Sequence, residues 1–295
     1  MSAAQRRVVS FAGSAVVIEY DGAQAAAVID FLYRHVPATG DVAPHAVYRL
    51  VSGERWSLDR DGTLLYQGPS QAALAQTLLG DTCHCLAERS QGGLLFHAAA
   101  LTWQGQGLLL PGGIGAGKTT LAAWLTARGL DYLTDELVFV PWGAETLQAF
   151  TRPLNLKRPA RPALRDQFDV EAHAAHVLSS PRADLIPPAS LKPDNVLSEP
   201  PWRVVLFPRY QPGADFHLRP LSKAQAGMAL MACLVNARNL PGHGFAEVAR
   251  LARLAPAYAL RYAHLDQIAG WIDDLLRSLE NSTQSRREAE TRRKG

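Results

Sequence analysis

The glycine-rich stretch at residues 112–119 is the part of the chain whose residue types point most directly to chemistry. It reads Gly-Gly-Ile-Gly-Ala-Gly-Lys-Thr and fits the pattern G-x-x-x-x-G-K-[ST] of loops that bind nucleotide phosphates. A polyphosphate must be wrapped closely by backbone N–H groups, so side chains are excluded and positive φ angles must be accessible. We therefore expect phosphate contacts from Gly112, Gly113, Ile114, Gly115, Ala116, Gly117, Lys118, Thr119 and Thr120.

Two side chains of this loop have predicted tasks of their own. Lys118 should reach the β- and γ-phosphate oxygens, and the hydroxyl of Thr119 should meet Mg²⁺. Residues 119–128 read as a helix whose positive N-terminal end would face the anion. The loop therefore predicts a nucleotide polyphosphate and Mg²⁺ as ligands. The alternative is a glycine-rich turn between a strand and a helix with an incidental lysine.

A pair of acidic residues and a histidine flank the loop in the sequence. Asp135 and Glu136 directly follow a short apolar run at 130–134, and the carboxyl ends of strands in an open α/β sheet lie on the side of the loop. Both carboxylates are thus candidate Mg²⁺ ligands together with Thr119. Asp135 could instead cap a turn, and Glu136 could lie on the surface. His97 lies within an apolar run, where a lone histidine is usually a core residue.

The elements that must position these residues follow from hydrophobic periodicity. Residues 107–111 read as a buried strand that leads into the loop, and Gly129 ends the helix that follows it. Residues 158–201 are rich in proline and polar residues, which predicts long irregular connections. The remaining elements expected in this half of the chain are strands at 93–103, 130–134, 137–141, 202–207 and 257–262 and helices at 224–236, 245–254 and 265–279.

The first ninety residues predict a small α+β unit without obvious chemistry. Strands are expected at 8–11, 15–20, 47–51, 55–58 and 63–66, with Asp61-Gly62 as a hairpin turn, and helices at 24–35 and 71–88. We therefore divide the chain into an N-terminal α+β domain (1–91), a catalytic domain (92–280) and a disordered basic tail (281–295).

Bulk composition narrows the class of protein further. The chain has 295 residues, of which 47% are hydrophobic and 19% are charged, as expected of a globular protein with a large core. The formal net charge of +3 is too small to predict binding to nucleic acid. No apolar run approaches membrane-spanning length, and the first residues do not resemble a signal peptide. Three cysteines suggest no disulfide framework, so we expect a cytoplasmic protein.

The order of His97, the loop at 112–119 and the pair Asp135-Glu136 resembles the catalytic half of bacterial HPr kinase/phosphorylase. The stretches 151–157 and 205–210 are similar to segments of the HPr-kinase-related group of small kinases, some of which phosphorylate the terminal Ser of lasso-peptide precursors. The resemblance covers roughly residues 92–279. It implies an α/β fold with a P-loop core like that of HPr kinase and ATP-dependent phosphoenolpyruvate carboxykinase.

The resemblance also implies roles for individual residues. Asp135, His97 and Lys118 would be catalytic, with Asp135 acting as the base or orienting group for the acceptor hydroxyl. His97 would lie near the transferring phosphoryl group or pair with Asp135. Charge toward the substrate or its phosphate would come from Arg152, Lys157 and Arg209. Because members of the family often form oligomers, the resemblance also allows a homo-oligomer.

The sequence departs from the bifunctional enzyme in three respects. Its acidic pair is Asp-Glu rather than two aspartates, Thr120 stands where an acidic residue follows the loop, and the first ninety residues are shorter than that enzyme's N-terminal domain. These differences weaken the case for HPr as the substrate and for a reverse phosphorylase reaction.

Three classes of function therefore stay open on the sequence. The leading hypothesis is a kinase that transfers the γ-phosphoryl group of ATP to a Ser or Thr hydroxyl of a peptide or protein. The second is a regulatory module that binds a nucleotide without efficient transfer. The third is a small-molecule phosphotransferase or carboxykinase-like enzyme. No feature of the sequence names the acceptor.

Overall fold

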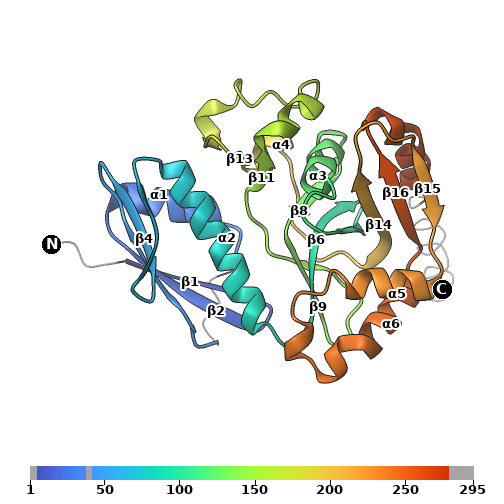
Figure 1. Cartoon of the computed structure of the whole chain (residues 1–295), viewed down its shortest axis with the longest axis horizontal. Helices are drawn as coiled ribbons and strands as arrows, with labels where there is room; N and C mark the ends of the chain where they lie inside the picture. The colour runs from blue at the N-terminus through green and yellow to red at the C-terminus, as the bar shows by residue number, and fades with distance from the viewer. Residues whose placement is uncertain (1–4, 38–41, 279–295) are drawn as a thin grey trace, which may run out of the picture.

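The chain folds into a mixed α/β structure, in which the residues described below form three β-sheets with flanking helices (Figure 1). This computed structural model describes residues 5–37 and 42–278, so the predicted basic tail lies outside the described residues. Within the described ranges, no helix is both long and apolar enough to cross a membrane.

The N-terminal sheet has the order β1-β2-β3-β4-β5. Its strands are β1 (Gln5–Phe11), β2 (Ser14–Tyr20), β3 (Val47–Val51), β4 (Trp56–Arg60) and β5 (Thr63–Gly68). Helix α1 (Gly22–Tyr33) joins the parallel pair β2 and β3, and α2 (Gln71–Arg89) follows β5. Asp61 and Gly62 have φ angles of 50° and 81°, which suits a tight two-residue hairpin. The elements predicted for the first ninety residues are confirmed.

The central sheet has eight strands in the order β10-β9-β6-β7-β14-β16-β15, and β8 also pairs with β6. These strands are β6 (Gly93–Trp103), β7 (Gln106–Pro111), β8 (Asp131–Thr134), β9 (Leu137–Pro141), β10 (Gln148–Ala149), β14 (Trp202–Tyr210), β15 (His217–Pro220) and β16 (Ala257–Tyr262). The predicted strands are confirmed, whereas β10 and β15 have no counterpart among them.

Strand directions in this sheet explain where the site can form. β6 is antiparallel to both β7 and β8, so β7 and β8 run in the same direction on either side of it. β14 is parallel to β7, and β16 is parallel to β14. The carboxyl ends of β7, β8, β14 and β16 therefore meet at one edge of the sheet, which is where ligands bind in open α/β sheets.

Helices cover both faces of the central sheet. On one face α3 (Lys118–Ala127) and the helical residues 266–278 share a buried cluster with strand residues such as Leu108 and Leu110. On the other face α5 (Lys223–Met231) and α6 (Phe245–Leu254) pack around Leu109 and Val205. Two short 3-10 helices, η3 (Ala237–Asn239) and η4 (Pro241–Gly244), connect α5 to α6. This two-sided burial accounts for the continuous apolar sequence of β7.

A small sheet forms between the segment 158–201, which was predicted to be irregular, and a strand immediately before it. β11 (Leu154–Lys157) pairs with β13 (Ala183–Ile186), which pairs with β12 (Leu178–Ser179). The segment also contains η1 (Arg158–Leu164), η2 (Ala174–His176) and α4 (Pro188–Leu191). The prediction of purely irregular connections is therefore wrong, because these strands are too short to show a clear alternation among the prolines.

The predicted helix at 224–236 ends early. α5 stops at Met231, and the next residues run beside β6: the N–H of Val235 donates to the carbonyl of Leu95 at 2.8 Å, and the N–H of Leu95 donates to Oδ1 of Asn236 at 3.0 Å. Pairing with a strand edge satisfies these backbone groups as a helix would. Tertiary contacts thus override the local helical preference here.

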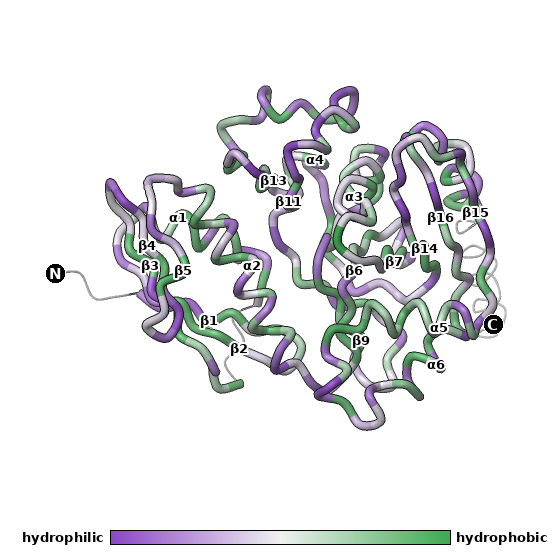
Figure 2. The backbone as a smooth tube through the Cα atoms, in the orientation of Figure 1, coloured by the Kyte–Doolittle hydropathy of each residue, from purple (hydrophilic) through white to green (hydrophobic). Residues whose placement is uncertain are grey.

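Hydrophobic residues line the interior of this arrangement, and much of β1, β2 and β9 is drawn as hydrophobic in Figure 2. The buried cluster of the N-terminal sheet and α2 extends across the predicted boundary at residue 91. It includes Leu95, Leu137, Phe139, Phe150 and Leu185 from the second half of the chain. The first ninety residues therefore pack directly on the strands that carry the candidate site.

Candidate active site

The glycine-rich loop lies between the carboxyl end of β7 and the first turn of α3. Gly115 and Gly117 have φ angles of 84° and 92°, a region that side chains with a Cβ rarely adopt. A Cβ on Gly117 would also lie 2.5 Å from the hydroxyl of Tyr262 and 3.1 Å from Cβ of Tyr210. Both the backbone conformation and the close approach of β14 and β16 therefore require glycine at this position.

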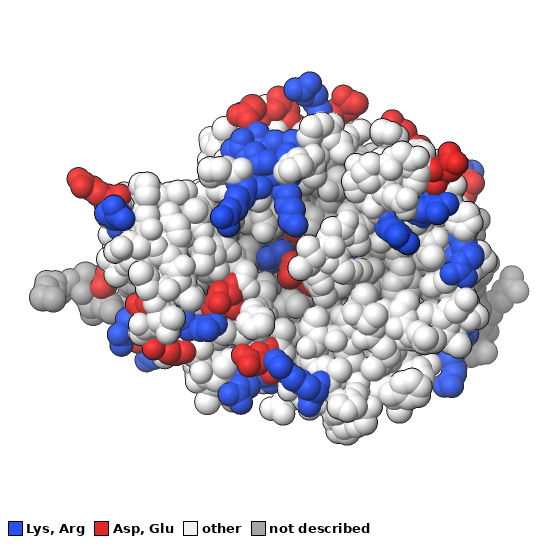
Figure 3. Space-filling model, in the orientation of Figure 1, with Lys and Arg blue, Asp and Glu red and all other residues white. Residues whose placement is uncertain are grey.

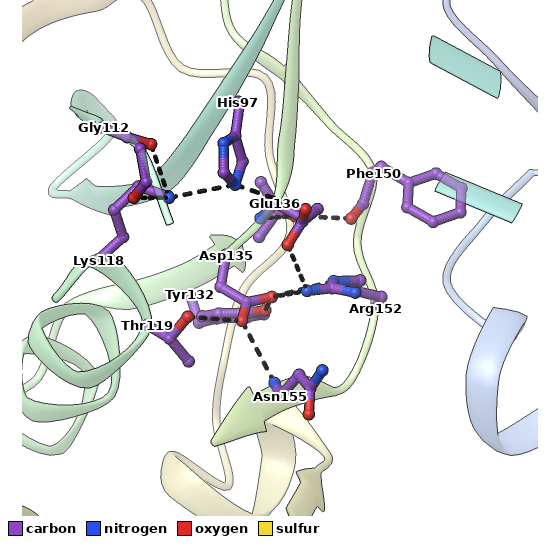
Figure 4. A network of polar contacts seen from close by, with 12 residues as sticks. His97, Gly112, Lys118, Thr119, Tyr132, Asp135, Glu136, Phe150, Arg152 and Asn155 are labelled. Atoms are coloured by element: carbon purple, nitrogen blue, oxygen red, sulfur yellow. Dashed lines mark hydrogen bonds and ion pairs between the residues drawn. The ribbon is translucent and has the colours of Figure 1, made fainter. Parts of the chain in front are cut away.

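Lys118 turns back over the loop from the start of α3 (Figure 4). Its Nζ donates to the carbonyl oxygens of Gly112 at 2.7 Å and Gly113 at 3.2 Å, and it lies 3.1 Å from Nε2 of His97. Burial lowers the pKa of Lys118, although the carboxylates of Glu136 and Asp135 act in the opposite direction. The ammonium group is thus held at the mouth of the loop by oxygen acceptors.

His97 is placed beside Lys118 by the pleat and register of β6. Phe96 and Ala98 pack into the cluster with α5 and α6, so the side chain between them points to the opposite face, toward α3. The N–H of Gly112 donates to the carbonyl of His97 at 3.4 Å. Burial and the neighbouring Lys118 lower the pKa of His97, which favours the neutral imidazole, and the tautomer without a proton on Nε2 can accept from the lysine.

Asp135 occupies the centre of the site and is only 1% exposed. Its Oδ2 accepts from the hydroxyl of Thr119 at 3.1 Å and from the N–H of Asn155 at 3.2 Å. Its Oδ1 accepts from the hydroxyl of Tyr132 and from Nε of Arg152, both at 3.0 Å. These four contacts satisfy both oxygens of the buried side chain, as is usual for polar groups without access to water.

Arg152 joins the two carboxylates and is 3% exposed. Its Nη2 lies 2.9 Å from Oδ1 of Asp135 and 2.9 Å from Oε2 of Glu136. Burial alone would lower the pKa of Arg152, but Asp135, Cys83 and Glu136 raise it well above its ordinary value. The guanidinium therefore stays charged and fixes both acidic side chains.

Glu136 is the more accessible carboxylate, with 35% of its side chain exposed. Its Oε1 lies 3.5 Å from Nε2 of His97, and its backbone carbonyl accepts from the N–H of Ala98 at 3.0 Å. The side chain therefore lies between Arg152 and the pair of His97 and Lys118 (Figure 4), which leaves it the better placed of the two carboxylates to meet a molecule from solvent.

The structure brings most of the predicted site residues together. His97, Lys118, Thr119, Asp135 and Glu136 form one connected network with Arg152. The sequence predicted that Arg152 supplies charge toward the substrate or its phosphate. The structure adds that its side chain is buried and bound to Asp135, which the sequence did not reveal. Lys157 is exposed at the end of β11. Arg209 is exposed near the end of β14. The N–H of the following residue, Tyr210, donates to the carbonyl of Ala116 in the loop at 3.0 Å.

Three contributors to the network were not predicted. The hydroxyl of Tyr132 and the N–H of Asn155 both bond to Asp135, and the carbonyl of Cys233 accepts from the N–H of His97 at 2.8 Å. Tyr132 lies in a short strand and looks like an ordinary core aromatic. The other two act through backbone atoms, which leave no signal in the residue type.

The oxygen atoms around Thr119 fit a magnesium ion. The hydroxyl of Thr119 and Oδ2 of Asp135 lie 3.1 Å apart, and hydroxyl and carboxylate oxygens are the hard donors that Mg²⁺ prefers. Within the described part of the chain, no group of three or more His, Cys, Asp or Glu side chains could hold a metal by itself. Mg²⁺ commonly has only one or two protein carboxylates and completes its shell with phosphate and water.

Comparisons with known proteins give a distant structural likeness and no match in sequence. A scan against protein-family models and a search of curated proteins found no match. Among solved structures the chain is similar to the Hpr(Ser) kinase/phosphatase from Coxiella burnetii, with 11% sequence identity and a TM-score of 0.35, over 66% of this chain and 96% of that chain. Because the sequence identity and the TM-score are both low, the roles proposed below rest on the residues of the present chain.

Proposed function

We propose that the protein is a kinase that transfers the γ-phosphoryl group of ATP, with Mg²⁺, to a Ser or Thr hydroxyl of a peptide or protein. The observation that carries the proposal is the contact between the loop hydroxyl of Thr119 and the buried carboxylate of Asp135, at 3.1 Å. It joins a candidate phosphate loop to a candidate metal and acceptor site. The resemblance of His97, the loop and the acidic pair to HPr-kinase-related enzymes agrees with it.

The loop supports the binding of a polyphosphate. Gly115 and Gly117 allow its backbone to curl at positive φ. Helix α3 begins within the loop at Lys118, and the N–H groups of a first helical turn have no partners inside the helix. The ammonium of Lys118 lies against two loop carbonyls, from which it can turn toward a phosphate oxygen. We place the nucleoside over the ends of β14 and β16, on the side of β7 away from Asp135.

The carboxylates support the chemical step. Thr119 and Asp135 would hold Mg²⁺, which supplies charge neutralisation to the phosphates when bound. Asp135 or the more exposed Glu136 would accept the proton of the acceptor hydroxyl as its oxygen forms a bond to the γ-phosphorus and the bond to the β–γ bridging oxygen breaks. Lys118 would stabilise the negative charge that develops on the phosphoryl oxygens, and ADP would leave.

The experiment that tests the proposal separates nucleotide binding from transfer. We would incubate the full chain with radiolabelled ATP, Mg²⁺ and two sets of acceptors, the products of neighbouring genes and a degenerate library of Ser- and Thr-containing peptides. Lys118→Ala should lose nucleotide affinity measured by calorimetry. Asp135→Asn and Glu136→Gln should keep most of it, and loss of the acceptor-activating group should slow transfer by about 100-fold or more.

The outcomes distinguish the open alternatives. Nucleotide binding without transfer to any acceptor would favour a regulatory module, and absence of nucleotide binding would refute the proposal. Asp274→Asn serves as the control for the carboxylate variants and should keep both nucleotide binding and transfer, because Asp274 lies outside the candidate site and pairs with Arg277 on the surface, with 70% of its side chain exposed. If Asp135→Asn and Glu136→Gln both stay active, neither carboxylate activates the acceptor.

A further inference from the structure

Exposed basic side chains gather over β11 and β13, above the central hollow of the molecule (Figure 3). We call Lys157, Arg158 and Arg182 the basic rim. All three are exposed. They are neighbours across the strand pair, because Lys157 is opposite Ala183 and the N–H of Arg158 donates to the carbonyl of Arg182 at 3.0 Å. Three like charges are therefore held close together at one end of the small sheet.

The charges of the basic rim are largely unmatched. Within the described residues, the side chains of Lys157 and Arg182 form no ion pair, and Nε of Arg158 donates to the carbonyl of Ser180 at 2.9 Å. The nearby Asp184 is already bound by Arg161, whose Nε and Nη2 lie 2.6 Å and 2.7 Å from its two oxygens. A cluster of cations without internal partners is a surface suited to an anionic ligand.

β11 connects this rim to the candidate active site. The N–H of Asn155 donates to Asp135 at 3.2 Å, and Lys157 lies two residues further along the same strand. Residues two apart point to the same face and are separated by about 7 Å. Leu154 and Leu156 occupy the other face, where they are buried against α3. Asn155 and Lys157 therefore share the face that is turned away from α3.

That face borders the opening between the N-terminal unit and the central sheet. Leu185, opposite Asn155 in the strand pair, packs into the cluster that contains the residues of α2. Figure 3 shows a hollow in this region with charged side chains at its floor and the basic cluster at its margin. The partly exposed Glu136 and the basic rim can therefore be reached by one extended molecule.

We propose that the basic rim binds acidic residues of the acceptor polypeptide, two to four positions from the Ser or Thr that receives the phosphoryl group. An extended chain advances about 3.3 Å per residue, which matches the separation of Lys157 from Asn155 with allowance for a long side chain. Several separated cations fit several carboxylates along a peptide better than one small anion. The inference rests on the proposed kinase function and adds the class of acceptor.

The test uses the full chain and short fluorescent peptides with a central serine flanked by glutamate, glutamine or lysine. Binding is measured by anisotropy with a non-hydrolysable ATP analogue and Mg²⁺, and transfer is measured with ATP. The glutamate peptide should bind most tightly. Lys157→Gln and Arg182→Gln should each weaken its binding by about two- to five-fold, the range expected of an exposed ion pair, and added salt should reduce the difference. The KM for ATP should not change.

A control variant and the other outcomes make the test decisive. Arg253→Gln removes an exposed cation from α6 and should leave peptide binding unchanged. Equal binding of the glutamate and glutamine peptides, or a change in the KM for ATP in place of the peptide effect, would overturn the inference. Phosphoryl transfer without a preference for the glutamate peptide would agree with the proposed kinase function and refute the proposed role of the basic rim. Binding of the glutamate peptide that depends on the basic rim, without transfer to any peptide, would support the proposed role of the rim and refute the proposed kinase function.

Discussion

Replacing the buried guanidinium of Arg152 is the sharpest test of how the site is held together. In Arg152→Met a side chain of similar length keeps the packing but removes the positive charge between Asp135 and Glu136. Asp135 is 1% exposed, so its charge would stay in a nonpolar environment with only the neutral donors Thr119, Tyr132 and the N–H of Asn155.

The size of the effect follows from this burial. Removing one partner of a buried ion pair typically lowers the free energy of unfolding by about 3–5 kcal/mol. Three neutral hydrogen bonds to Asp135 survive in the variant, so we expect a value near the lower limit, about 3 kcal/mol. Adding Asp135→Asn removes the uncompensated charge, and the double variant should recover about 1–3 kcal/mol relative to additivity.

Urea unfolding followed by tryptophan fluorescence measures these changes, since Trp124 and Trp202 are fully buried. Arg34→Met is the matched control. Arg34, which directly follows α1, pairs with Asp30 at 2.6 Å, but both side chains are exposed, and such a pair contributes about 0.5 kcal/mol or less. A loss for Arg152→Met no larger than that of the control, or strict additivity with Asp135→Asn, would show that the ion pair does not hold the site.

Three further predictions test other parts of the structure. Gly117→Ala should destabilise the protein more than Gly115→Ala in thermal melts. Both positions have a positive φ, but only at Gly117 would the new Cβ meet a neighbour, the Tyr262 hydroxyl at 2.5 Å. Equal decreases in melting temperature would contradict the steric argument. Burial raises the pKa of Cys83 to about 12, so mass spectrometry should find its thiol unmodified by iodoacetamide at neutral pH until urea unfolds the chain, and rapid labelling of the native protein would contradict its burial. Burial alone would raise the pKa of Asp184, but hydrogen bonds from Arg161 and Ser179 lower it below the ordinary value of 3.8. The stabilisation by the charged carboxylate is therefore complete above pH 3.8 and is lost as the pH falls through the lowered pKa of the folded state. In urea titrations at decreasing pH, Asp184→Asn should lose less free energy of unfolding than the unmodified chain.

The sequence predicted the elements around the loop well, because their signals are local. Alternation and apolar runs mark β6, β7 and β9, and the glycines mark the turn into α3. The position of Asp135 on the loop's side of the sheet was also expected. The route differs from a simple neighbouring strand: β8 pairs with β6 rather than with β7, and two antiparallel steps restore the common direction.

Other parts of the site depend on partners that are distant in sequence. The early end of α5 depends on hydrogen bonds to β6, which no local pattern contains. Arg152 looks like a surface or substrate residue in sequence, and only the packing of α2 against the following strands buries it beside Cys83. The strands β11 and β13 are short and lie among prolines, so their pairing and the basic rim at their end became visible only in three dimensions.

The antiparallel course of β6 between β7 and β8 has a consequence for how this chain can vary in length. His97 faces Lys118 because one register pairs Ala98 with Pro111 on one side and Ala100 with Thr134 on the other. If the pairing of the start of β6 with β9 is kept, a single residue inserted or deleted before His97 would put Phe96 or Ala98 in its place and reverse the faces of the strand residues that follow. We therefore expect natural relatives to keep the spacing of this strand fixed, and to place insertions in the connections between 158 and 201.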